Sequence, residues 1–373
     1  MHLIAWSIPV FVALIVLEYW LARRARRDLY RLSVSVSDVG CGVVEQMSGV
    51  LTTAAFVGLY FLVYEGRLVD LDPHAATTWL LAMVGVDLVY YWWHRASHEV
   101  GLLWATHVVH HHSEDYNLAV ALRQGIFTAG PLIVFGLPLA LLGVPPLLFL
   151  MSKAINSLYQ FWIHTELIGR LGPVEAVLNT PQHHRVHHAV NPRYLDKNYG
   201  GILIVWDRLF GTFARLDEAP VYGTTHRLRS LNPLWAQFEH FVELARGLAA
   251  ERGLSNRMRV LLARPGWRSR GPAAPLTRAE LAARAAARFH APVSSVMAAY
   301  ILLQAVGIVA ATMVVLIAAD GWPTWLAALA CATVIAGAVA LAGLAERRRW
   351  ALPLEVGRLV TTLAVASLVL TRG

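Results

Sequence analysis

The sequence predicts an all-α integral membrane protein, a multi-span helical bundle with a histidine-rich cytoplasmic cap. The 373 residues are 57% hydrophobic and 15% charged, with a mean hydropathy of +0.50, whereas a soluble globular chain carries about 25% charged residues. Several apolar runs reach the roughly 20 residues that a membrane-spanning helix needs. Histidine is concentrated, because ten of the 16 histidines lie within residues 94–112 and 183–188.

The first apolar run, residues 3–22, is followed at once by Arg23, Arg24, Arg26 and Arg27. A secretory signal would carry its positive charge before the apolar run and would offer a small-residue cleavage site after it. We therefore predict a retained helix whose carboxyl end faces the cytoplasm, where arginine and lysine accumulate.

Further apolar runs predict the rest of the bundle. Residues 128–163 hold two runs separated by Gly143, Pro145 and Pro146, which form either two spans or a re-entrant hairpin. A basic segment, residues 346–350, lies between the last two runs and should be cytoplasmic. The remaining predicted spans cover residues 38–64, 77–93, 294–318, 323–344 and 351–370.

The chain becomes polar between residues 168 and 290. Residues 198–214 predict a short interfacial helix or a strand pair, and the arginine-rich 250–290 predicts an exposed linker. The predicted parts are N-terminal membrane helices (1–75), a catalytic region of membrane helices plus cytoplasmic cap (76–245), an arginine-rich cytoplasmic linker (246–292) and C-terminal membrane helices (293–373).

Charge and cysteine content exclude several classes of protein. The net charge of +8 comes from arginines beside apolar runs, which favours membrane orientation over nucleic-acid binding. The two cysteines lie inside apolar stretches, so a disulfide framework or thiolate cluster is excluded and any metal must use nitrogen and oxygen ligands. Arginine- and alanine-rich usage is typical of GC-rich bacterial genomes, so we expect a bacterial inner-membrane protein whose active site faces the cytoplasm.

The histidines follow metal-ligand spacings. One pair reads HxxxH and two triplets read HxxHH, and positions i, i+3 and i+4 share a face of an α-helix. We therefore expect each triplet to aim its imidazoles at one point. A mononuclear site needs three or four donors, so nine candidates indicate two metals. The nine are His94, His98, His107, His110, His111, His164, His184, His187 and His188.

The identity of the metal is less restricted, since imidazole binds iron, zinc, copper and nickel. Redox chemistry on a lipid requires iron or copper, whereas a dinuclear zinc hydrolase would usually add bridging carboxylates. Isolated histidines such as His226 and His240 are expected to be surface or hydrogen-bonded residues. Adjacent helical residues diverge by about 100°, so neighbours of the ligands should support them from outside. The candidates for this outer role are His112, His183, Glu114, Asp115, Asp196 and Asn198.

In this order and spacing, the three histidine motifs resemble those of the fatty acid hydroxylase/sterol desaturase superfamily. The likeness covers about residues 90–215, and the stretches 92–124 and 181–213 are most similar to its alkylglycerol monooxygenase branch. The resemblance implies two iron ions held by the eight motif histidines, with His164 matching a further histidine of the family. It also implies that Glu99 holds a ligand or relays a proton.

The same resemblance implies a reaction and its partners. Members of the branch use O2 and tetrahydrobiopterin to hydroxylate the ether-bearing carbon of an alkylglycerol, and the product collapses to a fatty aldehyde and a glycerol derivative. We therefore expect a membrane lipid substrate and an electron donor, either a pterin or a redox protein. A sterol or fatty-acyl hydroxylase or desaturase remains an alternative within the superfamily. A histidine-rich metal transporter, which would place ionisable groups in mid-span, and a dinuclear hydrolase are alternatives from other classes.

Overall fold

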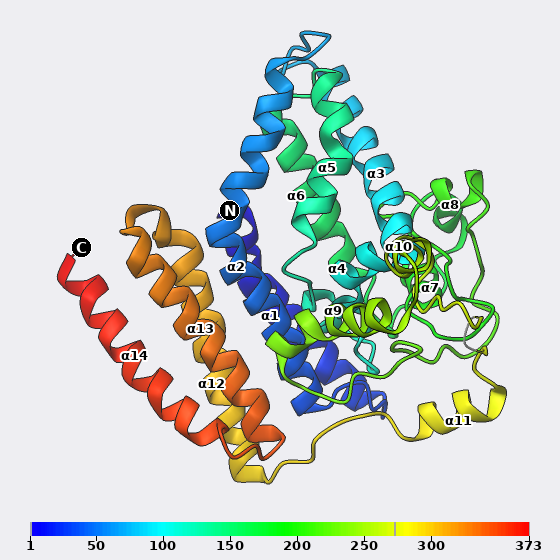
Figure 1. Ribbon diagram of the computed structural model, residues 1–373. Coiled ribbons are helices and arrows are strands. Elements are labelled where there is room, and N and C mark those ends of the chain that lie inside the picture. Colours follow the sequence, from blue (N-terminus) through cyan, green and yellow to red (C-terminus); the bar gives the residue numbers. More distant parts are fainter. Residues whose placement is uncertain (1, 272–273, 373) are drawn as a thin grey trace.

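The computed structural model describes residues 2–271 and 274–372, and its named secondary-structure elements are all helices, joined by irregular segments (Figure 1). Within those residues the only extended pairings are two isolated bridges, Leu178 with Leu203 and Ala189 with Tyr222. The all-α prediction is confirmed. The longer helices are α1 (His2–Arg24), α2 (Leu32–Glu65), α3 (Ala76–Glu99), α4 (Gly101–His111), α5 (Ala129–Leu141), α6 (Pro146–Trp162), α9 (Pro233–Ala250), α12 (Ser295–Ala318), α13 (Thr324–Ala345) and α14 (Ala351–Arg372).

Seven shorter helices among the described residues lie in the segments that connect the long ones. They are η1 (Val120–Leu122), η2 (Gly172–Ala176), α7 (Pro181–His187), α8 (Val205–Leu209), α10 (Leu254–Leu262), α11 (Arg278–Ala286) and η3 (Ala319–Gly321). Residues 198–214 therefore form one short helix, α8, with an isolated bridge, and no strand pair. The predicted linker is more ordered than expected, because Val260 of α10 is buried against Ala105 of α4 and Leu244 of α9.

Among the described residues, five helices are long and apolar enough to cross a membrane: α1, α2, α12, α13 and α14. The predicted apolar runs at both ends of the chain are thus confirmed as helices. The second begins earlier than expected, at Leu32, and its 34 residues extend over about 51 Å at 1.5 Å per residue. That length exceeds the roughly 30 Å of a hydrocarbon core.

The two runs within 128–163 form a helical hairpin. Its helices α5 and α6 have 13 and 17 residues, so α5 extends only about 20 Å and is short for a full span. They are joined at Gly143, whose φ of +89° and close approach to Val69 O leave no room for a side chain. The 24-residue α3, which includes the predicted span 77–93, is not among the five spanning candidates; it carries Asp87 in its apolar part and the HxxxH pair at its carboxyl end.

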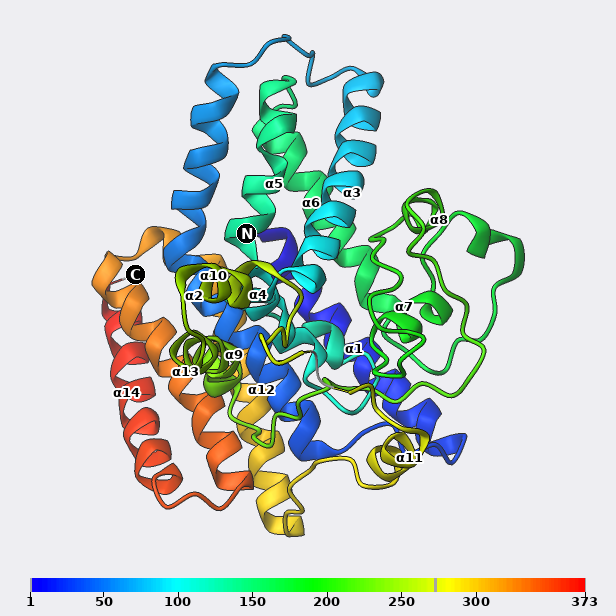
Figure 2. The ribbon, with the colours of Figure 1, turned by 45° about the vertical axis from the view of Figure 1, so that its right-hand side comes forward.

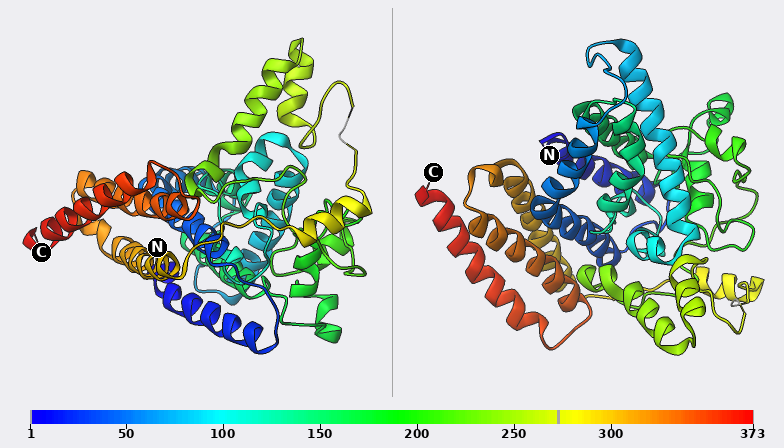
Figure 3. Two further views of the ribbon diagram at one scale, coloured as in Figure 1. Left: turned by 90° about the horizontal axis from the view of Figure 1, so that it is seen from below. Right: turned by 45° about the horizontal axis from the view of Figure 1, so that its top comes forward.

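Helix α2 is the element on which the two halves of the molecule meet. Its carboxyl half joins α3, α5 and α6 in an arm at the top of Figure 1, while α12 and α13 flank its amino half. Figure 2 shows α7 and α8 on the far side of this arm from α13 and α14, and Figure 3 shows α9 and α10 projecting from the side of the bundle. Val34 packs with Ile301 and Ala345, so the start of α2, the start of α12 and the end of α13 lie at one end.

A close backbone contact joins α2 to the segment that follows the second histidine motif. An ideal Cβ at Gly42 would lie 2.3 Å from Leu122 O of η1. Beside this contact, the buried Arg123 donates to Asp38 Oδ1 at 3.0 Å and to Val109 O at 2.7 Å. The segment is therefore held against α2 by both packing and a buried ion pair.

We predict that Gly42→Ala lowers the free energy of unfolding by about 1–3 kcal/mol, because the added methyl group meets a backbone carbonyl that cannot move aside easily. Chemical unfolding in detergent micelles measures the effect. The matched control is Gly58→Ala on the same helix, where no atom lies within 4 Å of an ideal Cβ. The control should be neutral or slightly stabilising, by up to about 1 kcal/mol. Equal effects of the two substitutions would contradict the contact.

Candidate metal centre

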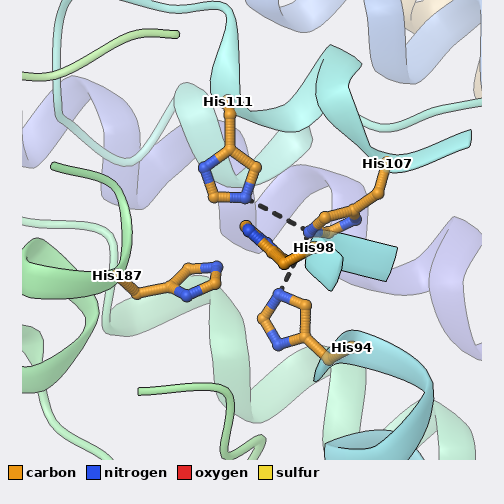
Figure 4. A group of neighbouring side chains, drawn as sticks. All are labelled: His94, His98, His107, His111 and His187. Atoms are coloured by element: carbon orange, nitrogen blue, oxygen red, sulfur yellow. Dashed lines mark hydrogen bonds between the residues drawn. The ribbon is translucent and has the colours of Figure 1, made fainter. Parts of the chain in front are cut away.

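The nine histidines predicted as ligands converge into two neighbouring groups, and all nine are buried. In each group the potential ligand atoms lie within 4.8 Å of one another. Figure 4 shows the first group with its rings turned toward a common centre. The five-histidine group consists of His94, His98, His107, His111 and His187. The four-histidine group consists of His110, His164, His184 and His188.

The imidazoles come from four places in the chain. Helix α3 supplies the HxxxH pair at its carboxyl end, and α4 carries the first HxxHH triplet. Helix α7 and its C-cap residue carry the second triplet, and His164 follows the end of α6. The isolated His164, which has no motif of its own, is thus needed to complete the smaller group.

The expectation that each HxxHH triplet aims at one point is wrong. In the first triplet, His107 and His111 belong to the five-histidine group and His110 belongs to the other. In the second triplet, His184 and His188 share a group and His187 joins the opposite one. Residues i and i+4 differ by about 40° around a helix, whereas i+3 and i+4 differ by about 100°. Each motif therefore reaches both groups.

The nitrogen spacings fit the coordination sphere of a metal ion. His107 Nε2 lies 3.0 Å from His94 Nε2 and 3.2 Å from His111 Nε2, contacts drawn as dashed lines in Figure 4. In the other group, His184 Nε2 lies 2.9 Å from His164 Nε2 and 3.1 Å from the Nε2 of His188. Metal–imidazole bonds of about 2.0–2.1 Å place neighbouring ligand nitrogens about 2.9–3.4 Å apart. The residues present fit two metal ions.

Backbone carbonyls orient four of these rings. A carbonyl oxygen can only accept, so each Nδ1 donates its proton and the lone pair of Nε2 faces the centre of the group. Two further nitrogens, His98 Nε2 and His187 Nε2, are buried and have no hydrogen-bond partner in the described part of the chain, so both can bind a metal. The four contacts are His94 to Tyr199 O at 2.8 Å, His110 to Arg123 O at 2.9 Å, His164 to Gln160 O at 2.7 Å and His187 to Lys197 O at 3.0 Å.

Burial keeps the imidazoles in the neutral form that binds metals. Loss of hydration lowers the pKa of His107, His111 and His188 well below the usual value, and neighbouring histidines lower it further. For His110 the pKa falls to about 4, again mainly through burial. At neutral pH these rings carry no proton on the ligating nitrogen, so metal binding need not displace one.

Two buried carboxylates that the sequence analysis did not select hold the loop whose carbonyls orient His94. Asp207 accepts from Tyr199 N at 2.8 Å and from Gly200 N at 2.7 Å. Asp87 accepts from Ile202 N at 2.7 Å, and also from the next backbone N–H and a tryptophan indole. The only sequence signal for Asp87 was a lone acid in an apolar helix, which is rarely present without a function.

Glu99, predicted to be catalytic, lies outside both histidine groups. It accepts from Arg95 Nε at 3.2 Å and lies 3.6 Å from Arg264 Nη2. Asp196 also contacts Arg264, at 3.0 Å. Together these residues form a partly exposed ion-pair network near the five-histidine group, and within the described residues neither carboxylate accepts a hydrogen bond from a histidine.

The other predicted acidic residues likewise form ion pairs. Glu114 accepts two hydrogen bonds from Arg227 at 2.5 Å. The buried Asp115 contacts Arg31 and Arg288. Burial raises the pKa of Asp115 to about 7, although the two arginines act in the opposite direction. These carboxylates brace the cap and leave the metal groups free of acidic side chains.

His112 and His183 are outside both groups, as the adjacency argument expected. Asn198, with φ of +58°, donates to His183 O at 3.0 Å. Asn198 directly follows Lys197, whose carbonyl accepts from His187. It therefore supports the centre through the backbone of the loop and not by contact with a ring.

Comparison with known proteins agrees with this geometry. The sequence model of the fatty acid hydroxylase family matches residues 79–212, the stretch that contains all nine histidines. Residues 79–212 belong to the fatty acid hydroxylase family. No solved structure matches the chain.

Relatives of this fatty acid hydroxylase region extend the similarity further along the chain. An alkylglycerol monooxygenase of Homo sapiens is 41% identical over 271 residues, which are 72% of this chain and 60% of that protein. The Xenopus tropicalis enzyme of the same name is 41% identical over 71% of the chain and 59% of the relative. An ornithine lipid hydroxylase of Rhizobium tropici is 32% identical over 138 residues, 36% of this chain and 41% of that protein. The chain thus spans about 60% of the length of the first two relatives.

The division of each triplet between two groups can be tested by metal content. We expect His107→Ala and His110→Ala each to retain about one of two irons, and the double variant to retain almost none, because the two side chains serve different groups. Iron per chain, measured by mass spectrometry, checks this. The control His183→Ala should keep both irons, since this ring lies outside both groups. A double variant that still holds one iron would show that the triplet serves a single metal.

Proposed function

We propose that this protein is an O2-dependent diiron lipid monooxygenase that cleaves ether lipids in the manner of the alkylglycerol monooxygenases. The observation that carries the proposal is the pair of adjacent histidine groups with Nε2 atoms turned inward. The similarity of the alkylglycerol monooxygenases over 71–72% of the chain supports the substrate class. The nine histidines are assigned as iron ligands on the same grounds.

The proposed reaction needs an oxidant, because an alkyl C–H bond is not acidic and acid–base residues alone do not break it. Two irons bound in the histidine groups would supply that oxidising chemistry with O2. One oxygen atom enters the C–H bond beside the ether oxygen and the other leaves as water, with two electrons from a donor such as a tetrahydropterin or a redox protein. The hydroxylated ether then collapses to a fatty aldehyde and a glycerol derivative.

The residues of the chain position the substrate and exclude water. A small cavity lies between α3, α5 and α6, lined by Val86, Tyr90, Phe149 and Lys153 among others. The ring of Tyr90 is 5.1 Å from that of His94. We propose that the lipid chain enters from the bilayer between these helices and passes Tyr90, although the cavity itself is too small to hold the chain.

The hydroxyl group of Tyr90 also links the cavity to the four-histidine group. It donates to Gln160 Oε1 at 2.7 Å, and the carbonyl of Gln160 accepts from His164. Tyr90 therefore lies between the cavity and residues of both groups. Glu99, at the partly exposed edge of the five-histidine group, is assigned to proton transfer with solvent.

The protein is assigned to a bacterial inner membrane, with the histidine groups on the cytoplasmic side. The arginines after α1 and those before α14 support this orientation, because positive charge accumulates on the cytoplasmic side. Packing of Val34 with Ala345 places the two arginine-rich segments at the same end of the helices, so a single orientation satisfies both.

The activity is tested with the iron-loaded protein in detergent, an alkylglycerol, O2 and tetrahydrobiopterin. We expect release of a fatty aldehyde with matching O2 consumption, and loss of both in His184→Ala. His183→Ala should keep measurable turnover, because an outer residue typically contributes about 10–100-fold. An ester-linked acylglycerol of the same chain length serves as the substrate control.

One alternative is carried by a specific observation, the similarity to an ornithine lipid hydroxylase. A hydroxylated acyl chain formed from the ester control, without aldehyde from the ether lipid, would favour a fatty-acyl hydroxylase. Absence of O2 consumption with either lipid would contradict both assignments.

The orientation makes a separate prediction. Cysteines introduced at positions 217 and 262, both exposed in the cap, should resist a membrane-impermeant thiol reagent in intact cells and react after lysis, because the cap is proposed to be cytoplasmic. A cysteine at position 68, in the exposed loop between α2 and α3, is the control and should react in intact cells. Labelling of the cap positions from outside would reverse the proposed topology.

A further inference from the structure

A third group of potential metal ligands lies apart from the nine histidines, on the outside of the cap. It consists of His226, Glu239 and Glu243, whose ligand atoms lie within 4.8 Å of one another. His226 Nδ1 is 3.6 Å from Glu239 Oε1. The His226 side chain is 73% exposed, and those of Glu239 and Glu243 are 15% and 27% exposed, so the group is open to solvent on one side.

The two carboxylates lie on one face of α9, because they are four residues apart. Burial and the neighbouring Glu243 raise the pKa of Glu239. Glu243 has cationic partners, with His240 Nδ1 at 3.0 Å and Arg268 Nη2 at 3.6 Å. Glu239 differs, since within the described chain its ion-pair partners are histidines and include neither lysine nor arginine.

The loop that carries His226 is anchored on both sides. Arg227 forms a two-bond ion pair with Glu114. Arg284 donates to the carbonyls of residues 224 and 225, each at 2.7 Å. The backbone at His226 is therefore held beside α9, although the side chain itself is exposed. This preorganisation lowers the entropy cost of binding a ligand there.

A second observation comes from the buried side of the group. The side chain of His112 is 2% exposed and its Nε2 lies 3.9 Å from Glu239 Oε2, too far for a hydrogen bond. Its Nδ1 has no hydrogen-bond partner in the described residues. The nitrogen that faces Glu239 is Nε2, which makes no hydrogen bond in the described residues, so the lone pair of Nε2 could bind a cation held by Glu239, whereas Nδ1 points away from it.

We propose that His226, Glu239 and Glu243, with His112 approaching from the buried side, form a binding site for a divalent cation of the zinc type. Two imidazoles and two carboxylates are a donor set that zinc accepts with four-fold coordination. The exposed His226 gives the ion a path from solvent. The site is separate from the nine-histidine centre and does not depend on the reaction proposed for it.

The position of the site suggests what the cation does. Helix α4 ends at His111 and His112 is its C-cap residue, while α9 and the 224–229 loop lie outside it. A cation joining His112 to Glu239 and His226 would tie these three segments together. It would brace the end of α4 that carries His110 and His111, and so stabilise the cap.

The test uses the iron-loaded full chain in detergent, with Zn²⁺ as the probe, titrated by calorimetry. The wild-type chain should bind one zinc with no loss of iron. His226→Gln and Glu243→Gln should each weaken zinc binding by more than about tenfold, because each removes a direct ligand. Zinc should raise the midpoint temperature of thermal unfolding of the wild type, because an ion that binds only the folded state stabilises that state. Zinc should not raise the midpoint of Glu243→Gln.

The control is His290→Gln, another exposed histidine outside the group, which should bind zinc as the wild type does. His226→Gln alters an exposed side chain, so it remains informative even if Glu243→Gln fails to fold. Zinc binding that is equal in the wild type and His226→Gln, or absent from the wild type, would overturn the proposal. Zinc uptake that displaces iron would also overturn it, because the ion would then occupy the nine-histidine centre.

Discussion

The centre depends on one kind of contact, the hydrogen bond from an imidazole Nδ1 to a backbone carbonyl. Four of the nine histidines make it, and each contact turns the lone pair of Nε2 toward the middle of its group. Three of the carbonyls lie within 13 residues of their histidines in the sequence, whereas Tyr199 O is 105 residues from His94. The ring of His94 is therefore oriented only after the 199–203 loop has packed against α3. Asp87 and Asp207 fix the loop from residue 199 to 203, and thereby extend this dependence into the membrane-proximal arm.

Nine neutral imidazoles in a buried space also constrain the rest of the cap. Burial and mutual repulsion disfavour protonation, so acidic partners are not needed to hold the rings. The acidic residues of the cap are used elsewhere, in ion pairs with arginines that tie loops together. This division explains why Glu114 and Asp115, close to the histidines in sequence, contact Arg227 and Arg31.

The membrane helices contribute to the site through α2 more than through direct contact. Gly42 allows η1 to lie on α2, and the buried Asp38 neutralises Arg123, whose carbonyl orients His110. The C-terminal helices pack on the amino half of the same helix. A substitution in α2 should therefore alter both the packing of the helical bundle and the orientation of the histidines at the metal centre.

The sequence by itself determined the helical membrane class and the nine candidate ligands, because hydropathy and the spacing of histidines are local properties of the chain. It did not determine how the ligands are divided between the two histidine groups. A helix presents residues i+3 and i+4 about 100° apart, and only the position of the neighbouring helices decides which imidazoles come together. The same limit applies to Glu99 and Asp196, near the histidines in sequence but paired with arginines. Glu239 and His226 meet His112 only because α9 folds back over α4, a contact between segments more than 100 residues apart in the chain.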